Sequence, residues 1–142
     1  MNKSIKSVLL AVVASSIFVS CHTSETVSEG SAATKKREFR GAWIQCVNGQ
    51  FQGLSTAEMQ RNLTQQLNTL KAEGANAIIF QVRPECDALY QSSIEPWSRY
   101  LTGQQGQAPS PYWDPLQWMV SECHKRNMEL HAWINPYRAL TK

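Results

Sequence analysis

The stretch Ala77-Ile78-Ile79-Phe80-Gln81-Val82-Arg83-Pro84 decides the fold. It is nearly continuously apolar as far as Val82, and Pro84 ends it because proline cannot donate a ladder hydrogen bond. A short run of this kind is typical of a strand buried on both faces in a parallel sheet. Parallel neighbours need long crossover connections, usually helices, so we expect a helix on each side of residues 77–82.

The segment before this strand carries helix signals. Ser55 and Glu58 have the Ser-x-x-Glu spacing of a capping box, and Gly74 suits the position just after a helix. Between them, apolar side chains recur at spacings of four, four and three, which predicts one buried face. The members of this stripe are Met59, Leu63, Leu67 and Leu70.

The segment after the strand repeats the pattern. Asp114 and Pro115 suit the N-cap and first position of a second helix, which ends near Asn127. Its apolar stripe is Leu116, Met119, Val120 and Cys123. Short apolar runs at 39–47 and 130–134 predict two more strands. The order is therefore strand, helix, strand, helix, strand.

This order opens either a (β/α)8 barrel or a doubly wound sheet. A dinucleotide-binding sheet would place a glycine-rich fingerprint after the first strand, and residues 47–53 lack one. We therefore predict an α/β fold, the N-terminal β-α-β-α-β portion of a (β/α)8 TIM barrel. Such a barrel takes roughly 250 residues, so we expect it to be incomplete in 142 residues and the chain to be the N-terminal piece of a longer protein.

Residues 1–21 resemble a lipoprotein signal peptide. Lys3 and Lys6 precede a short apolar run, and the stretch ends at Ser20-Cys21, which is similar to a lipobox. We expect lipidation at Cys21, although an ordinary signal with an incidental cysteine remains the alternative. His22 follows the cysteine where an Asp would favour inner-membrane retention, so we expect an outer-membrane anchor. Residues 22–37 lack large apolar side chains and predict a flexible tether.

Net charge and cysteine spacing indicate which kinds of partner and cofactor to expect for residues 38–142, the predicted folded part. The formal net charge is +3 at pH 7 and falls to 12 − 11 = +1 without Lys3 and Lys6, so we expect no nucleic-acid partner. The remaining cysteines, Cys46, Cys86 and Cys123, fit no zinc spacing. We expect buried free thiols, with one disulfide as the alternative, and neither a metal nor another cofactor.

Ligands of either architecture bind beyond the carboxyl ends of the strands. Residues 83–113 lie there and form a connection far longer than usual, rich in charged and aromatic side chains. Aromatic faces stack on sugars, and charged groups bind hydroxyls, so we predict a glycan cleft. A loop packed by its own aromatic side chains is the alternative. The predicted substrate-binding residues are Arg83, Glu85, Asp87, Trp97, Asn135, Tyr137 and Arg138.

Glu85 and Asp87 are also candidates for catalysis. A glycosidase uses two carboxyl groups about 5 to 9.5 Å apart, which residues just past a strand could supply. Structural pairs of Arg83 with Asp87, or of Arg138 with Glu85, would explain the same charges. His131 lies deeper on its strand, where we expect a hydrogen-bonded core histidine.

Several motifs together resemble the glycosyl-hydrolase-like-ten family from about residue 36 to residue 142. They are Arg37-Glu38-Phe39-Arg40-Gly41-Ala42-Trp43, Phe80-Gln81-Val82-Arg83-Pro84, Ile94-Glu95-Pro96-Trp97-Ser98, Leu101-Thr102-Gly103 and His131-Ala132-Trp133-Ile134-Asn135-Pro136-Tyr137-Arg138. The resemblance implies a (β/α)8 barrel in an exported, often lipid-anchored, bacterial protein.

The resemblance also implies hydrolysis of glycosidic bonds, with peptidoglycan glycan strands as one substrate. An acidic Asp-Asp-Tyr-Phe-type motif, which family members carry on a later strand, is absent before Lys142. We therefore expect the catalytic carboxylates beyond this stretch. A non-catalytic glycan-binding lipoprotein or an inactive fragment is the alternative.

Overall fold

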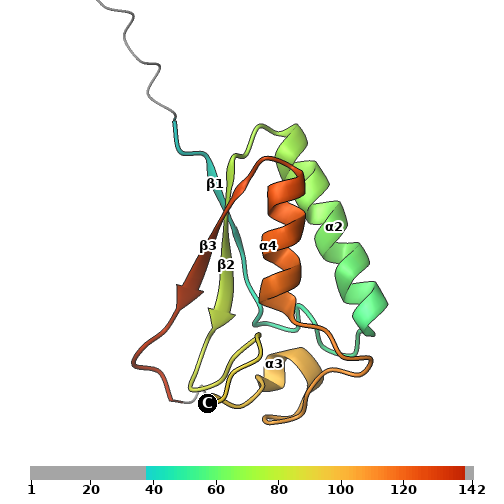
Figure 1. Cartoon of the computed structure of the whole chain (residues 1–142), viewed down its shortest axis with the longest axis vertical. Helices are drawn as coiled ribbons and strands as arrows, with labels where there is room; N and C mark the ends of the chain where they lie inside the picture. Colours follow the sequence, from blue (N-terminus) through green and yellow to red (C-terminus); the bar gives the residue numbers. More distant parts are fainter. Residues whose placement is uncertain (1–37, 140–142) are drawn as a thin grey trace, which may run out of the picture. The chain divides into compact units, whose positions relative to one another are not determined.

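The computed structural model describes residues 38–139, which fold as an α/β unit with one parallel three-stranded sheet (Figure 1). The predicted signal peptide, the tether and Cys21 lie outside the described residues. The elements in chain order are β1 (Gly41–Ile44), α2 (Thr56–Ala72), β2 (Ala77–Arg83), α3 (Arg99–Thr102), α4 (Pro115–Lys125) and β3 (Glu129–Ile134). The sheet order is β1-β2-β3, with β2 in the centre.

The boundaries of α2 follow the predicted caps. The amide of Glu58 donates to Ser55 Oγ at 3.3 Å, and the amide of Ser55 donates to Glu58 Oε2 at 2.8 Å, which completes the capping box. Gly74 follows the helix with φ +89°, a left-handed conformation that suits glycine. Asp114 caps α4 in the same manner, by accepting from the amide of Gln117.

The predicted central strand is confirmed as a buried parallel strand. Residues 77–80 of β2 pair with Gly41–Ile44 on one side, and β2 pairs with β3 on the other. Ile78, Phe80 and Val82 point into the core that the sheet shares with the helices. Figure 1 shows α2 and α4 on the same side of the three strands. One hydrophobic core between the sheet and this helical layer therefore holds the unit together.

The opposite face of the sheet is aromatic and open among residues 38–139. Trp43 and Trp133 meet edge to face with ring centroids 5.2 Å apart, yet Trp43 is 48% exposed. His131 also lies on this side and is exposed, so its expected place in the core was wrong. It contacts the Phe39 ring and Glu129 Oε2 instead, because no described element covers this face.

Some predicted details differ from the structure. The first strand is shorter than residues 39–47, and α3, a single helical turn capped by Ser98, was not predicted. The three cysteines have free thiols; Cys46 and Cys123 are buried, but Cys86 is exposed, contrary to expectation. Burial raises the pKa of Cys123 to about 11. Within residues 38–139, every helix is too short or too polar to cross a membrane.

Candidate site at the carboxyl edge of the sheet

The carboxyl ends of the three strands point toward the long connection that contains α3 (Figure 1). The buried Gln81 ties two of these ends together, because its Oε1 accepts a hydrogen bond from the amide of Cys46 at 3.1 Å. The amide of Asn135 donates to the carbonyl of Arg83 at 2.8 Å, which joins the ends of β2 and β3. Hydrogen bonds therefore connect the carboxyl ends of all three strands to one another.

The long connection folds back on itself. Ala88 and Trp97 form an isolated parallel bridge, in which the amide of Ser98 donates to the carbonyl of Ala88 at 2.8 Å. Trp97 is half-buried against the core and meets the Tyr112 ring edge to face at 6.2 Å. Asp114 Oδ2 accepts from the amide of Gln91 at 2.8 Å. Packing by its own aromatic side chains, the alternative to a glycan cleft, therefore explains part of this loop.

Arg83 joins three parts of the edge. Its Nε and Nη2 donate to Glu95 Oε1 at 3.1 and 2.6 Å, and its Nη1 donates to the carbonyl of Asn135 at 2.9 Å. The side chains of Arg83 and Glu95 are only 17% and 21% exposed. The partner of Arg83 is therefore Glu95 and not Asp87.

Glu85 lies beneath the loop and is 1% exposed. Its Oε1 accepts from Arg99 Nη2 at 3.1 Å and from the Tyr100 hydroxyl at 3.2 Å. The alternative pairing of Glu85 with Arg138 is therefore wrong, because Glu85 pairs with Arg99 at the start of α3. The guanidinium of Arg99 also lies over the Tyr100 ring, 5.0 Å from its centroid.

Asp87 is fully buried, and neither of its carboxylate oxygens makes a hydrogen bond of ordinary geometry within residues 38–139. Burial raises the pKa of Asp87 above its ordinary 3.8, and the nearby charge of Glu85 raises it further. The Ser98 hydroxyl and backbone amides of Glu85 and Arg99 only partly offset these effects. Burial, assisted by the charge of Asp87, likewise raises the pKa of the Cys46 thiol.

Asn135 shapes the turn after β3. Its Oδ1 accepts hydrogen bonds from the amides of Tyr137 and Arg138, both at 3.2 Å. The Tyr137 side chain is 94% exposed, and Arg138 is exposed as well. These two side chains are therefore the most accessible of the predicted substrate-binding residues.

The structure brings Arg83 and Asn135 into direct contact and buries the side chains of Glu85 and Asp87. Sequence reasoning left three partners out of the predicted site: Glu95, Arg99 and Tyr100. All three lie in the long loop rich in charged and aromatic side chains, and Glu95 also belongs to the motif Ile94-Glu95-Pro96-Trp97-Ser98. Across residues 38–139, no three His, Cys, Asp or Glu side chains gather closely enough to hold a metal ion.

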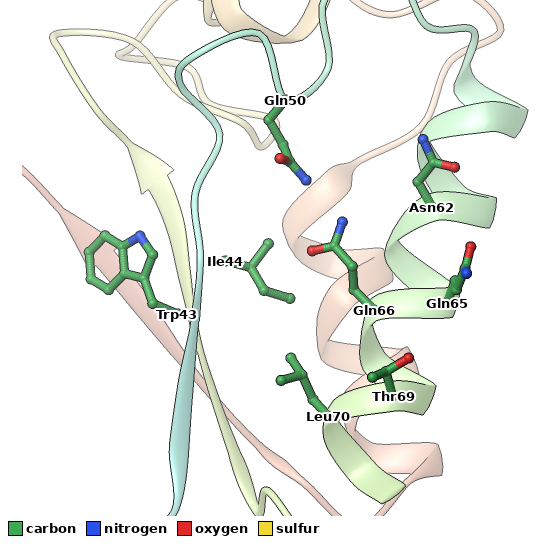
Figure 2. A pocket seen from close by; sticks show the side chains of 8 residues that line it. All are labelled: Trp43, Ile44, Gln50, Asn62, Gln65, Gln66, Thr69 and Leu70. Atoms are coloured by element: carbon green, nitrogen blue, oxygen red, sulfur yellow. The ribbon is translucent and has the colours of Figure 1, made fainter. Parts of the chain in front are cut away.

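A groove of about 580 Å³ lies elsewhere, between the free edge of β1 and α2 (Figure 2). Its lining combines amide side chains with Trp43 and Leu70, and it contains none of the predicted site residues. The amides come from Gln50, Asn62, Gln65 and Gln66. This groove marks the open side of β1.

The fold and the edge together define an α/β protein with charged and aromatic side chains gathered beyond the strands of a parallel sheet. Residues 38–140 match the family Glycosyl hydrolase-like 10, so the chain belongs to this family, as its motifs predicted.

Two relatives illustrate the similarity. The chain is 44% identical over 110 residues to Glycosyl hydrolase YngK of Bacillus subtilis (strain 168), covering 75% of this chain and 21% of that protein. It is 47% identical over 79 residues to Glycosyl hydrolase DigH of Escherichia coli (strain K12), covering 56% of this chain and 18% of that protein. The chain thus spans about a fifth of the length of these curated relatives.

Proposed function

We propose that this protein is a glycoside hydrolase whose residues 38–139 form the first three strands of a (β/α)8 barrel. The observation that carries the proposal is the family membership of residues 38–140. The parallel sheet, with both helices of the core on one side and an open aromatic face on the other, supports a barrel. In a barrel that face would turn inward and pack against further strands.

The proposed substrate is a polysaccharide such as the glycan strands of peptidoglycan. The two relatives carry glycosyl hydrolase in their names, and the exposed Tyr137 and Arg138 suit a sugar ring and its polar groups. Asn135 stabilises the turn that carries Tyr137 and Arg138 by accepting hydrogen bonds from their backbone amides. We propose that the carboxylates that perform hydrolysis lie on later strands, because Glu85 and Asp87 are enclosed by the loop.

The test is direct. The complete gene product, including any sequence that the reading frame adds after codon 142, would be incubated with purified peptidoglycan and with a panel of other polysaccharides. New reducing ends on any of these substrates support the proposal, and their absence on all of them contradicts it. A Tyr137→Ala variant should raise KM more than it lowers kcat, because Tyr137 is proposed to bind rather than to react.

A non-catalytic glycan-binding protein is the second candidate. The burial of Glu85 and Asp87 favours it, because these weak candidates for catalysis are closed to a substrate in this structure. Co-sedimentation with insoluble peptidoglycan in the absence of hydrolysis would identify this alternative.

We also propose that the protein is anchored by lipid at Cys21 in the cell envelope, at the outer membrane. The order of basic, apolar and small residues before Cys21 supports this proposal. A Cys21→Ala variant should leave the membrane fraction and escape processing before residue 21. A variant that stays in the membrane fraction with the same mature N-terminus would rule the anchor out.

A further inference from the structure

We propose that Glu95 is a positioning residue of the glycan cleft, acting through Arg83 on the turn that presents Tyr137 and Arg138. This inference rests on the proposed function for its substrate. Its structural half, the support of the turn, stands on contacts within the described residues alone.

The first step of the argument is how Glu95 itself is held. The Ser92 hydroxyl accepts hydrogen bonds from the amides of Ile94 and Glu95, at 3.1 and 3.0 Å. The next residue, Pro96, accepts from the amide of Ala88 at 2.9 Å. Glu95 therefore projects from a local turn shaped by Ser92, and the bond between Pro96 and Ala88 ties this turn to the start of the loop.

The second step is the path from Glu95 to the turn. Glu95 takes up Nε and Nη2 of Arg83, which leaves Nη1 aimed at the carbonyl of Asn135, 2.9 Å away. An Arg side chain offers its donors in a rigid planar fork, so fixing one edge of the fork fixes the direction of the remaining donor. The carboxylate of Glu95 thus sets where Arg83 holds Asn135.

The third step is what Asn135 controls. Its backbone is held on both sides, by the Arg83 side chain and by the Arg83 carbonyl. Its side chain then accepts from the amides of Tyr137 and Arg138. A shift of Asn135 would move both exposed side chains together, which would weaken binding before it affected bond cleavage.

The chain offers a matched control pair. Glu122 on α4 and Arg126, the C-cap of that helix, form an ion pair at 2.7 Å with exposures of 13% and 16%, close to those of Glu95 and Arg83. Glu122 also accepts from Lys125 Nζ at 2.6 Å. Glu122→Gln weakens two ion pairs and should therefore cost at least as much stability as Glu95→Gln, without touching the turn. A difference between the Glu95→Gln and Glu122→Gln variants separates positioning from stability.

The first measurement is trypsin cleavage of the Arg138–Ala139 bond in the complete protein, followed by mass spectrometry. Glu95→Gln should accelerate this cleavage about tenfold, equivalent to about 1.4 kcal/mol, and Glu122→Gln should leave it unchanged. Equal cleavage rates in the two variants would overturn the proposal, whether or not the protein hydrolyses glycans.

The second measurement is the steady-state kinetics on whichever polysaccharide the wild-type protein hydrolyses. Glu95→Gln should raise KM with kcat retained, and Glu95→Asp, which keeps the charge, should recover most of the loss. If Glu95→Gln does not fold, Arg83→Lys replaces it, because lysine keeps the charge but lacks the fork. Faster cleavage at Arg138 with an unchanged KM would overturn the role in the cleft. A wild type without any hydrolysis would refute the proposed function instead, and the trypsin result would still decide the support of the turn.

Discussion

Replacing Glu85 with Gln tests whether this carboxylate fastens the loop or binds substrate. Glu85 is 1% exposed and accepts hydrogen bonds from Arg99 and Tyr100. Glutamine keeps nearly the same shape and an acceptor oxygen but removes the negative charge. The variant therefore isolates the charge of Glu85 from its packing.

The expected loss of stability in Glu85→Gln follows from the burial of Glu85. Removing one partner of a fully buried ion pair costs about 3–5 kcal/mol. Water reaches the other partner here, because Arg99 is 38% exposed. We therefore expect Glu85→Gln to lower the free energy of unfolding by about 1–3 kcal/mol, between the buried and surface limits.

Urea denaturation of the complete protein measures this loss, and kcat/KM on the accepted polysaccharide is measured on the same samples. Glu38→Gln is the control, because Glu38 forms an exposed ion pair with Arg40 and should change little. If Glu85 fastens the loop, stability falls and the folded fraction accounts for any lost activity. Unchanged stability with a fall in kcat/KM would refute this reasoning and place Glu85 in the cleft.

Two further predictions concern titration and the start of α2. Because the pKa of Asp87 is raised in the folded state, the wild type should lose stability relative to Asp87→Asn as pH rises from 3.8 through the raised value, by at most about 1.4 kcal/mol per pH unit. Urea midpoints across this range measure the difference, and a parallel pH dependence of the two proteins would contradict the assigned shift. Ser55→Ala should cost about 1 kcal/mol, because it removes the acceptor at the N-terminus of α2. A loss below about 0.3 kcal/mol by the same assay would show that the cap is dispensable.

The sequence predicted the parts of the fold that depend on local chemistry. Ser55, Asp114 and Gly74 mark helix ends because their side chains or backbone freedom act within one turn. The strand at residues 77–82 was predictable because an apolar run between two helix patterns has few alternatives. The short helix at Arg99–Thr102 was not, because four residues carry no periodicity.

The open face of the sheet shows a second limit of prediction from the sequence, which concerns burial. His131 and Trp133 alternate along β3 and lie on one face of the sheet, as the period of a strand predicts, but this period does not reveal what covers that face. Trp43 and His131 are exposed because no element within residues 38–139 covers this face. Predicting that a side chain on a strand is buried therefore assumes that another element of the fold covers its face.

Ion pairing at the site was the least predictable feature. Arg83, Glu85 and Asp87 are neighbours in sequence, which suggested that they would pair with each other or with Arg138. The loop instead brings Glu95 to Arg83 and Arg99 to Glu85. Partner choice depends on the path of the residues that follow β2, and no local pattern in the sequence specifies that path.

The ion pairs also separate two kinds of residue at the carboxyl edge of the sheet, those that are buried and those that stay exposed. A buried charge must be paired or neutralised, and the buried carboxyl groups fit this rule: Glu85 pairs with Arg99, and burial raises the pKa of Asp87. Tyr137 and Arg138, in the turn after β3, keep their side chains exposed. We therefore expect this part of the edge to bind glycan through the turn after β3. A glycosidase also requires an accessible pair of carboxyl groups, and we expect those groups on another part of the rim.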